Sequence, residues 1–93
     1  MRQDMRETLI RWRDGQTYPT GSFLEAVLAN DLMGAFAYAD EDNREHMFDF
    51  AMFLYNDMPG RTGNPDIDIW GSYEAIKNTL KRRNNALTLD KPE

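Results

Sequence analysis

The sequence predicts an all-α domain, a compact bundle of about four to five short helices with an irregular loop before the last helix. Three observations predict it. Apolar residues recur at spacings of three and four along most of the 93 residues, residues suited to N-capping precede several of these stretches, and glycine or proline separates them. Hydrophobic residues make up 41% of the chain, enough for a core in a single domain.

The first predicted helix spans residues 2–13. Met5, Leu9 and Trp12 recur at helical spacing, and charged residues occupy the other positions. The stretch 14–21 contains two glycines and a proline, which end the helix and predict a connector.

A second helix is predicted over residues 23–29. Ser22 stands three residues before Glu25, the spacing of a capping box. The pair at 30–31 either ends this helix or starts another, and we favour a break followed by a new helix over 32–37. The new helix is rich in small residues, which permit close approach to a neighbouring helix.

Asp40 precedes the stretch predicted to form the longest helix. Its carboxylate suits an N-cap, and Glu41 and Asp42 place negative charge at the positive end of the helix dipole. A broad apolar face follows, as expected of a central core helix. That face consists of Met47, Phe48, Phe50, Ala51, Leu54, Tyr55 and Met58. Proline and glycine at 59–60 end the helix.

Residues 60–71 form the longest stretch without a regular period, and we predict that this is the functional loop. Trp70 lies near its end. This side chain either folds back to close a small core or serves as an anchor for a partner. Both alternatives are compatible with the sequence.

Ser72 is predicted to cap the last helix, and the asparagine pair at 84–85 is predicted to end it. Basic residues near that end complement the negative end of the helix dipole. The basic residues are Lys77, Lys81, Arg82 and Arg83. We therefore predict one helical domain over residues 1–85 and a flexible tail over 86–93.

The net charge of −5 is unevenly distributed. Residues 1–13 carry +2, residues 14–68 carry −9, and residues 69–93 carry +2. Such an acidic middle repels nucleic acid directly and favours a partner with a basic surface, including a nucleic-acid-binding host complex. The alternative is a solvated face that keeps the protein soluble.

Several other classes of protein are disfavoured. Without cysteine the chain has neither disulfides nor a thiolate zinc site, which fits a reducing compartment. The polar first residues lack the apolar stretch of a secretory signal, and no apolar run approaches the about 20 residues of a membrane span. We expect a cytoplasmic protein that binds no membrane.

The acidic residues do not form a recognisable metal motif. Stretches beginning at Asp40 or Asp66 lack the glycine and glutamate positions of an EF-hand loop. Asp66 and Asp68, being in a loop, are the better candidates for weak calcium binding, but we predict no metal site. No phosphate-binding glycine loop is present, so no cofactor is predicted either.

Catalysis is likewise not predicted. His46 is the only histidine, and Asp49 follows it by one helical turn. A di-metal carboxylate site needs further histidines, and Ser22 and Ser72 are better explained as helix caps than as nucleophiles. We therefore predict no catalytic residues and no enzyme.

The chain resembles a set of small phage and prophage proteins. The resemblance rests on GSFLEAVLANDL at 21–32, AD at 39–40, YNDMP at 55–59 and WGS at 70–72, and it covers roughly residues 19–80. It implies an origin and no particular activity. In the related proteins the WGS element follows the proline closely, whereas here residues 60–69 intervene.

Together these observations predict a phage-derived, acidic protein-binding module, an inhibitor or modulator of a host protein or defence complex, for example anti-CRISPR-like. Two alternatives stay open: a structural or self-assembling phage accessory protein, which would be a homo-oligomer, and a small enzyme or weak metal-binding protein. The predicted partner-binding residues are Asp40, Glu41, Asp42, Glu45, Asp49, Asp66, Asp68 and Trp70.

Overall fold

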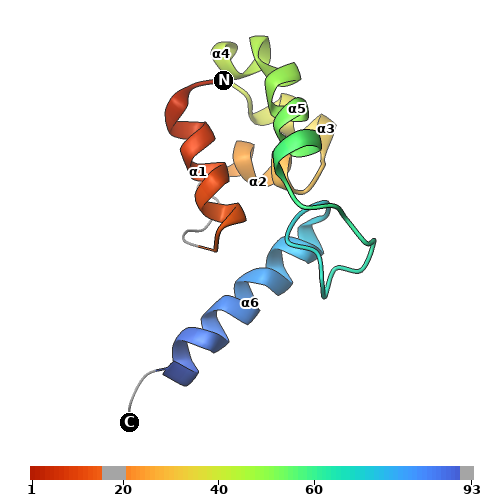
Figure 1. The fold of residues 1–93 in the computed structure, drawn as a ribbon. Helices are drawn as coiled ribbons and strands as arrows, with labels where there is room; N and C mark the ends of the chain where they lie inside the picture. The colour runs from red at the N-terminus through yellow and green to blue at the C-terminus, as the bar shows by residue number, and fades with distance from the viewer. Residues whose placement is uncertain (16–20, 91–93) are drawn as a thin grey trace.

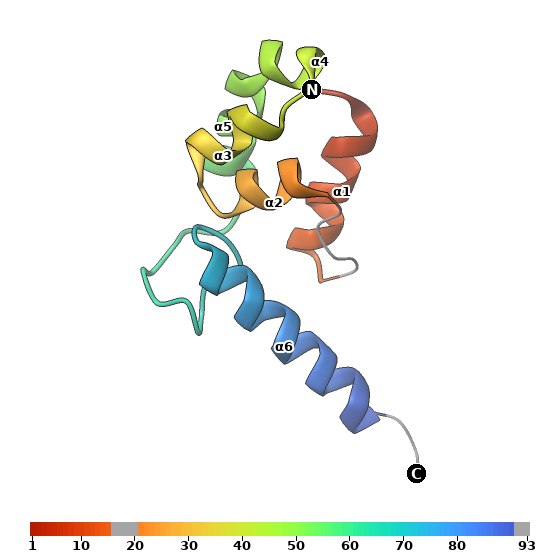
Figure 2. The same cartoon turned by 180° about the vertical axis from the view of Figure 1, so that it is seen from behind.

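The computed structural model describes residues 1–15 and 21–90, with the backbone alone beyond residue 84. In this part of the chain there are six helices and no strand, which confirms the all-α prediction. The helices are α1 (Gln3–Arg13), α2 (Ser22–Leu28), α3 (Leu32–Tyr38), α4 (Glu41–Glu45), α5 (Met47–Asp57) and α6 (Tyr73–Asp90). Helices α1 to α5 gather in one body, and α6 extends away from it (Figures 1 and 2).

Two interruptions of the helical backbone give six helices where the sequence predicted four to five. Asn30 takes a left-handed conformation with φ of 59°, and Asp31 then caps α3 by accepting a hydrogen bond from the Gly34 N–H at 2.9 Å. The break predicted at 30–31 is thus present. The second break was not predicted: His46, with φ of −109° and ψ of 17°, divides the expected long helix into α4 and α5.

The longest helix is α6, with 18 residues, and the prediction for the helix starting near Asp40 was wrong. Helix α6 runs through the asparagine pair at 84–85, where the sequence predicted its end. Asparagine disfavours a helix interior by less than about 1 kcal/mol, so without glycine or proline two of them do not stop a helix. Of the predicted tail, residues 91–93 lie outside the described residues, as does most of the predicted connector, 16–20.

The capping predictions were correct at two of three helices. Asp40 accepts a hydrogen bond from the Asn43 N–H at 2.8 Å, and the Ser72 hydroxyl oxygen accepts one from the Ala75 N–H at 3.0 Å. Ser22 makes no cap. Gly21 occupies the N-cap position of α2, so the helix begins one residue earlier than the capping box required.

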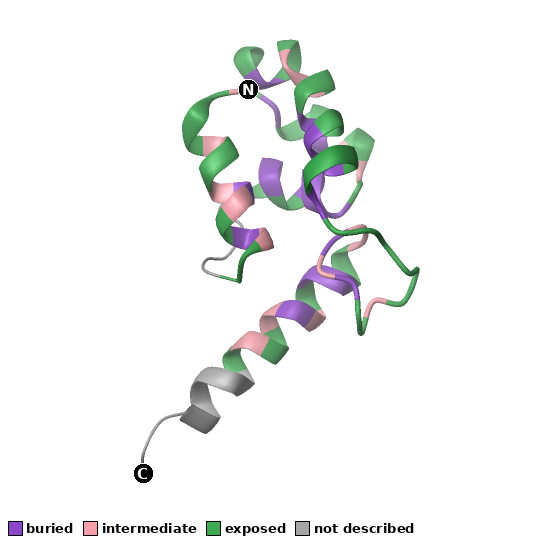
Figure 3. Cartoon of the chain, viewed as in Figure 1, coloured by how far each residue is buried: buried purple, intermediate pink, exposed green. Residues whose placement is uncertain are grey.

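The core lies where α1, α2 and α5 face one another, as the buried segments in Figure 3 show. Phe23 and Phe50 meet edge to face, with ring centroids 5.0 Å apart. The side chains with less than 2% exposure and the largest volumes are Trp12, Phe50, Leu9 and Leu28. The broad core face predicted for residues 47–58 is only partly buried, since Phe48 and Tyr55 are 73% and 83% exposed.

Candidate protein-interaction surface

The loop before α6 is folded onto the body, and Trp70 closes the core there. Its indole N–H donates to the Pro59 carbonyl oxygen at 2.7 Å, and the Arg61 guanidinium lies 4.9 Å from its ring centre. Only 8% of the side chain is exposed. Of the two alternatives for Trp70, the structure favours the core, and little of the indole is accessible to a partner.

Asp68 is buried inside the same loop. Its carboxylate accepts hydrogen bonds from the Thr62 N–H at 2.8 Å, the Thr62 hydroxyl at 2.9 Å and the Gly63 N–H at 3.0 Å. These bonds, first that of the Thr62 N–H, hold the pKa of Asp68 below its usual 3.8 although burial opposes them. Asp68, predicted to contact a partner, is therefore buried in the loop, and its carboxylate organises the loop backbone.

Two of the four basic residues of α6, Arg82 and Arg83, contact the loop and α1. Because α6 continues past them, they do not lie at its C-terminal end as predicted. Arg82 donates to the Asp66 carbonyl oxygen at 2.7 Å, and Arg83 donates to the Trp12 carbonyl oxygen at the same distance. The Arg83 guanidinium also lies 4.3 Å from the Trp12 ring centre. These cations hold the loop and α1 against α6.

Asp66, predicted to contact a partner, is exposed at the tip of this loop. Its carboxylate accepts a hydrogen bond from the Asn78 side-chain amide at 3.0 Å, and its backbone N–H donates to Asn64 at 2.9 Å. The residue therefore helps to fix the loop geometry while one side stays in solvent.

The acids around α4 are mostly exposed. Asp40 caps α4 and lies 3.7 Å from the Arg2 guanidinium, and Asp49 lies 3.0 Å from the Met1 amino group. The three acids within α4 form what we call the acidic cluster: Glu41, Asp42 and Glu45. Among the described residues, Asp42 pairs only with His46, at 3.6 Å, and the other two carboxylates make no ion pair.

His46 lies half-buried at the junction of α4 and α5. Its Nδ1 is 2.7 Å from the Asp42 carbonyl oxygen, so one ring nitrogen is engaged locally. The Ser72 hydroxyl is engaged as a helix cap, at a different end of the molecule. The acid beside this histidine is Asp42, at 3.6 Å, and among the described residues neither Ser22 nor Ser72 contacts it.

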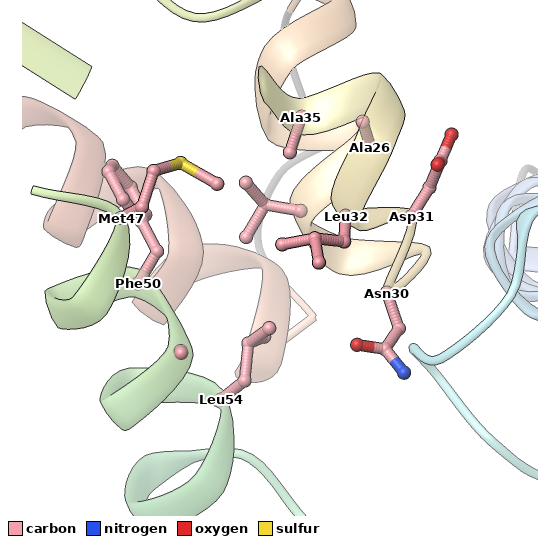
Figure 4. Close-up of a pocket in the computed structure, with 10 residues that line it drawn as sticks. Ala26, Asn30, Asp31, Leu32, Ala35, Met47, Phe50 and Leu54 are labelled. Carbon is pink, nitrogen blue, oxygen red and sulfur yellow. The ribbon is translucent and has the colours of Figure 1, made fainter. Parts of the chain in front are cut away.

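An apolar pocket that the sequence did not reveal lies between α3 and α5. It has a volume of about 90 Å³ and is floored by residues of α2. Figure 4 shows Leu32 and Leu54 reaching into it from opposite sides, whereas the carboxylate of Asp31 points away. The pocket is lined by Ala26, Val27, Asn30, Asp31, Leu32, Ala35, Met47, Phe50, Ala51 and Leu54. We call it the α3–α5 pocket.

Exposed apolar side chains lie on α3 and α5, the two helices that form the walls of this pocket. On α3, Leu32 is 64% exposed and Phe36, one turn later, is 42% exposed. On α5, Phe48 and Tyr55 stand three residues before and four residues after Ala51, which places them on the same side of the helix. In the sequence, the exposure of Phe48 and Tyr55 was indicated by the width of the apolar face on residues 47–58. That face is too broad for one neighbouring helix to cover.

A hydrogen bond between Tyr73 and Asp31 fixes the end of the pocket against α6. The Tyr73 hydroxyl donates to the Asp31 carboxylate at 2.6 Å. This bond is the main cause that lowers the pKa of Asp31, with the Gly34 N–H second. The same bond, followed by burial, raises the pKa of Tyr73 to about 12.

Comparison with known proteins adds no family to this description. No protein-family model matches the chain, and no curated protein or solved structure matches it significantly. Within the described ranges, no three histidine, aspartate or glutamate side chains are grouped so that they could hold a metal ion. No helix of those ranges has both the length and the apolar character needed to cross a bilayer.

Proposed function

We propose that this chain is a small acidic protein-binding module that inhibits or modulates a host protein or defence complex, such as a CRISPR effector. The observation that carries the proposal is the exposed apolar border of α3 and α5 on the same body as the acidic cluster of α4. The phage context comes from the resemblance of residues 19–80 to small phage and prophage proteins.

The exposed apolar side chains of α3 and α5 support a binding role. Large contiguous apolar patches on soluble proteins usually mark sites that contact another molecule. Here Leu32, Met33, Phe48 and Tyr55 are each more than half exposed, on two neighbouring helices. Covering them with a partner removes apolar surface from water, which is the main source of affinity in protein complexes.

Charge supports a basic partner. Residues 14–68 carry a net −9, and two of the three carboxylates of the acidic cluster make no ion pair among the described residues. Proteins that hold nucleic acid line their channels with lysine and arginine. An acidic module is attracted to such a channel over long range and competes with the nucleic acid for it.

The test is binding to a purified, nucleic-acid-free CRISPR effector at increasing salt concentration. We expect a complex at low salt that weakens as salt rises, because the attraction between the two surfaces is screened. A triple variant, Glu41→Lys/Asp42→Lys/Glu45→Lys, should lose binding while its helical circular dichroism is unchanged.

A matched control carries the same change of charge elsewhere: Glu7→Lys/Asp14→Lys/Glu74→Lys, at three exposed acids on α1, after it and on α6. We expect this control to bind nearly as the unmodified chain does. If no complex forms at low salt, effector inhibition is wrong. If light scattering also gives a mass of two or more times the 10.9 kDa of one chain, the self-assembling alternative explains the exposed apolar side chains instead.

A further inference from the structure

We propose that the α3–α5 pocket binds one aliphatic side chain that projects from a short, basic, amphipathic helix of the partner protein. This inference rests on the proposed function and names the chemistry of the partner segment. Three features of the pocket carry it: its size and lining, the direction of its borders, and the charge of the chain around it.

The size and lining of the pocket select a single aliphatic group. Its volume of about 90 Å³ is smaller than the about 150 Å³ cavity that holds a benzene molecule, so it suits one branched aliphatic side chain. Small residues at Ala26, Ala35 and Ala51 leave this space open. A polar group entering it would lose hydration without gaining a hydrogen bond.

The two polar residues of the lining do not make the pocket suitable for a polar group. The Asp31 carboxylate is turned out of the pocket, where it accepts hydrogen bonds from the Gly34 N–H at 2.9 Å and the Tyr73 hydroxyl at 2.6 Å. Asn30, the other polar residue, is at the rim and exposed. The interior of the pocket is therefore apolar.

The borders of the pocket favour a helix as the bound element. On α3, Leu32, which lines the pocket, and Phe36 are exposed one turn apart, and on α5, Phe48 and Tyr55 are exposed two turns apart, each within one turn of the lining residue Ala51. Two apolar ridges with a hollow between them form the groove in which amphipathic helices lay their apolar face. The anchor side chain occupies the hollow, and its neighbours one turn away contact the ridges.

The charge around the groove favours a basic helix. Residues 30–58, which include both walls, carry seven acids against one arginine, a net −6 with His46 neutral. Lysine and arginine on the polar face of the bound helix face the acidic cluster of α4, the helix that lies between α3 and α5 in the chain. A second copy of this chain is disfavoured as the occupant, because a symmetric contact through the same surface would bring like charges together.

The test measures fluorescence anisotropy of a labelled helical peptide made of leucine and lysine, with the leucines on one face. Two control peptides accompany it: one with serine in place of leucine at equal charge, and one with glutamate in place of lysine. We expect the leucine–lysine peptide to bind at least about tenfold more tightly than either control, because it alone combines a buried anchor with complementary charge.

The matched variants are Ala51→Leu and Ala37→Leu. Both replace an exposed alanine on a helix with a residue that helices favour, but only Ala51 lines the pocket. We expect Ala51→Leu to fill the pocket and weaken the leucine–lysine peptide about tenfold, and Ala37→Leu to leave it unchanged. Leu32→Ala, which shortens an exposed wall, should also weaken binding with little effect on folding.

Equal affinity for the serine and leucine peptides, or no difference between Ala51→Leu and Ala37→Leu, would overturn the inference. A dimer in light scattering that Ala51→Leu dissociates would assign the pocket to a second copy and also overturn it. If a host effector binds but Ala51→Leu has no effect on that complex, the inference fails and the proposed function stands. If the peptide binds as expected and no effector binds, the pocket assignment stands and effector inhibition fails.

Discussion

Polar atoms on aromatic side chains join distant parts of this chain. Trp12 donates to the Ile69 carbonyl oxygen at 2.9 Å, Trp70 to the Pro59 carbonyl oxygen at 2.7 Å, and Tyr73 to the Asp31 carboxylate at 2.6 Å. Each of these bonds involves a residue of the loop or of its junction with α5 or α6. Aromatic residues suit this role because they add a directed hydrogen bond to a large apolar contact.

The Tyr73–Asp31 bond makes stability sensitive to alkaline pH. The pKa of Tyr73 is raised from 10.0 to about 12 in the folded chain, so folding favours the protonated phenol. The corresponding stability is complete below pH 10.0 and is lost as pH rises toward about 12, because the unfolded chain ionises first. Tyr73→Phe should therefore show a smaller alkaline fall in melting temperature than the unmodified chain. An identical fall in both would mean that the hydrogen bond does not form.

The burial of Trp70 predicts a large effect on stability. Trp70→Ala should lower the free energy of unfolding by about 3–5 kcal/mol, since it leaves a cavity and removes the partner of the Pro59 carbonyl. Trp70→Phe should cost clearly less, because most of the apolar contact is kept. Urea denaturation followed by circular dichroism measures both. A surface anchor would instead show nearly unchanged stability in either variant.

At the scale of elements, the start of α3 depends on an arrangement that only glycine permits. A Cβ atom on Gly34 would lie closer to the Asp31 carboxylate than van der Waals contact allows. That carboxylate caps α3 and holds Tyr73, so its displacement would disturb both contacts. The α3–α5 pocket depends on the same turn, because Asn30 and Asp31 line one end of it.

Gly34→Ala is therefore expected to destabilise the protein. Inside most helices this substitution stabilises by about 1 kcal/mol, since alanine is the better helix former. Here we expect the loss of the Asp31 cap to outweigh that gain and the pKa of Tyr73 to fall back toward 10.0. Thermal denaturation and an alkaline titration of tyrosine absorbance measure the two effects. An increase in melting temperature would show that Asp31 finds another way to cap α3.

At the scale of the whole molecule, two carboxylates connect segments that the backbone alone would not hold together. Asp31 links α3 to α6 through Tyr73, and Asp68 organises the loop that α6 packs against. The Thr79 hydroxyl and Arg82 of α6 contact the Asp68 carbonyl oxygen. We therefore expect protonation of the two carboxylates to weaken the contacts of α6 with α3 and with the loop.

This dependence predicts loss of stability in acid. The pKa values of Asp31 and Asp68 are both lowered from 3.8 by the hydrogen bonds they accept, so the folded chain favours the ionised forms. Their contribution is present above pH 3.8 and is lost as pH falls through the folded pKa values. The double variant Asp31→Asn/Asp68→Asn should start from a lower melting temperature and lose less of it between about pH 5 and about pH 2. A parallel loss in both proteins would contradict this role.

Local sequence patterns were sufficient to predict most of the helices and part of the candidate surface. The caps at Asp40 and Ser72 were predictable because capping needs only a side chain and the backbone three residues later. The exposure of Glu41, Asp42 and Glu45 followed from their charge. The burial of Trp70 and Asp68 was not predictable, because their hydrogen-bond partners belong to a loop without a regular period.

By itself, the sequence determined an all-helical chain, the acidity of its middle and two of its helix starts, since these depend on neighbouring residues and on composition. Only the tertiary structure decided that Phe48 and Tyr55 lie in solvent, that α6 continues past residue 84 and that an apolar pocket opens between α3 and α5. The reason is that burial depends on which distant segments pack against a helix face. A periodic apolar stripe specifies a face but not the partner that covers it.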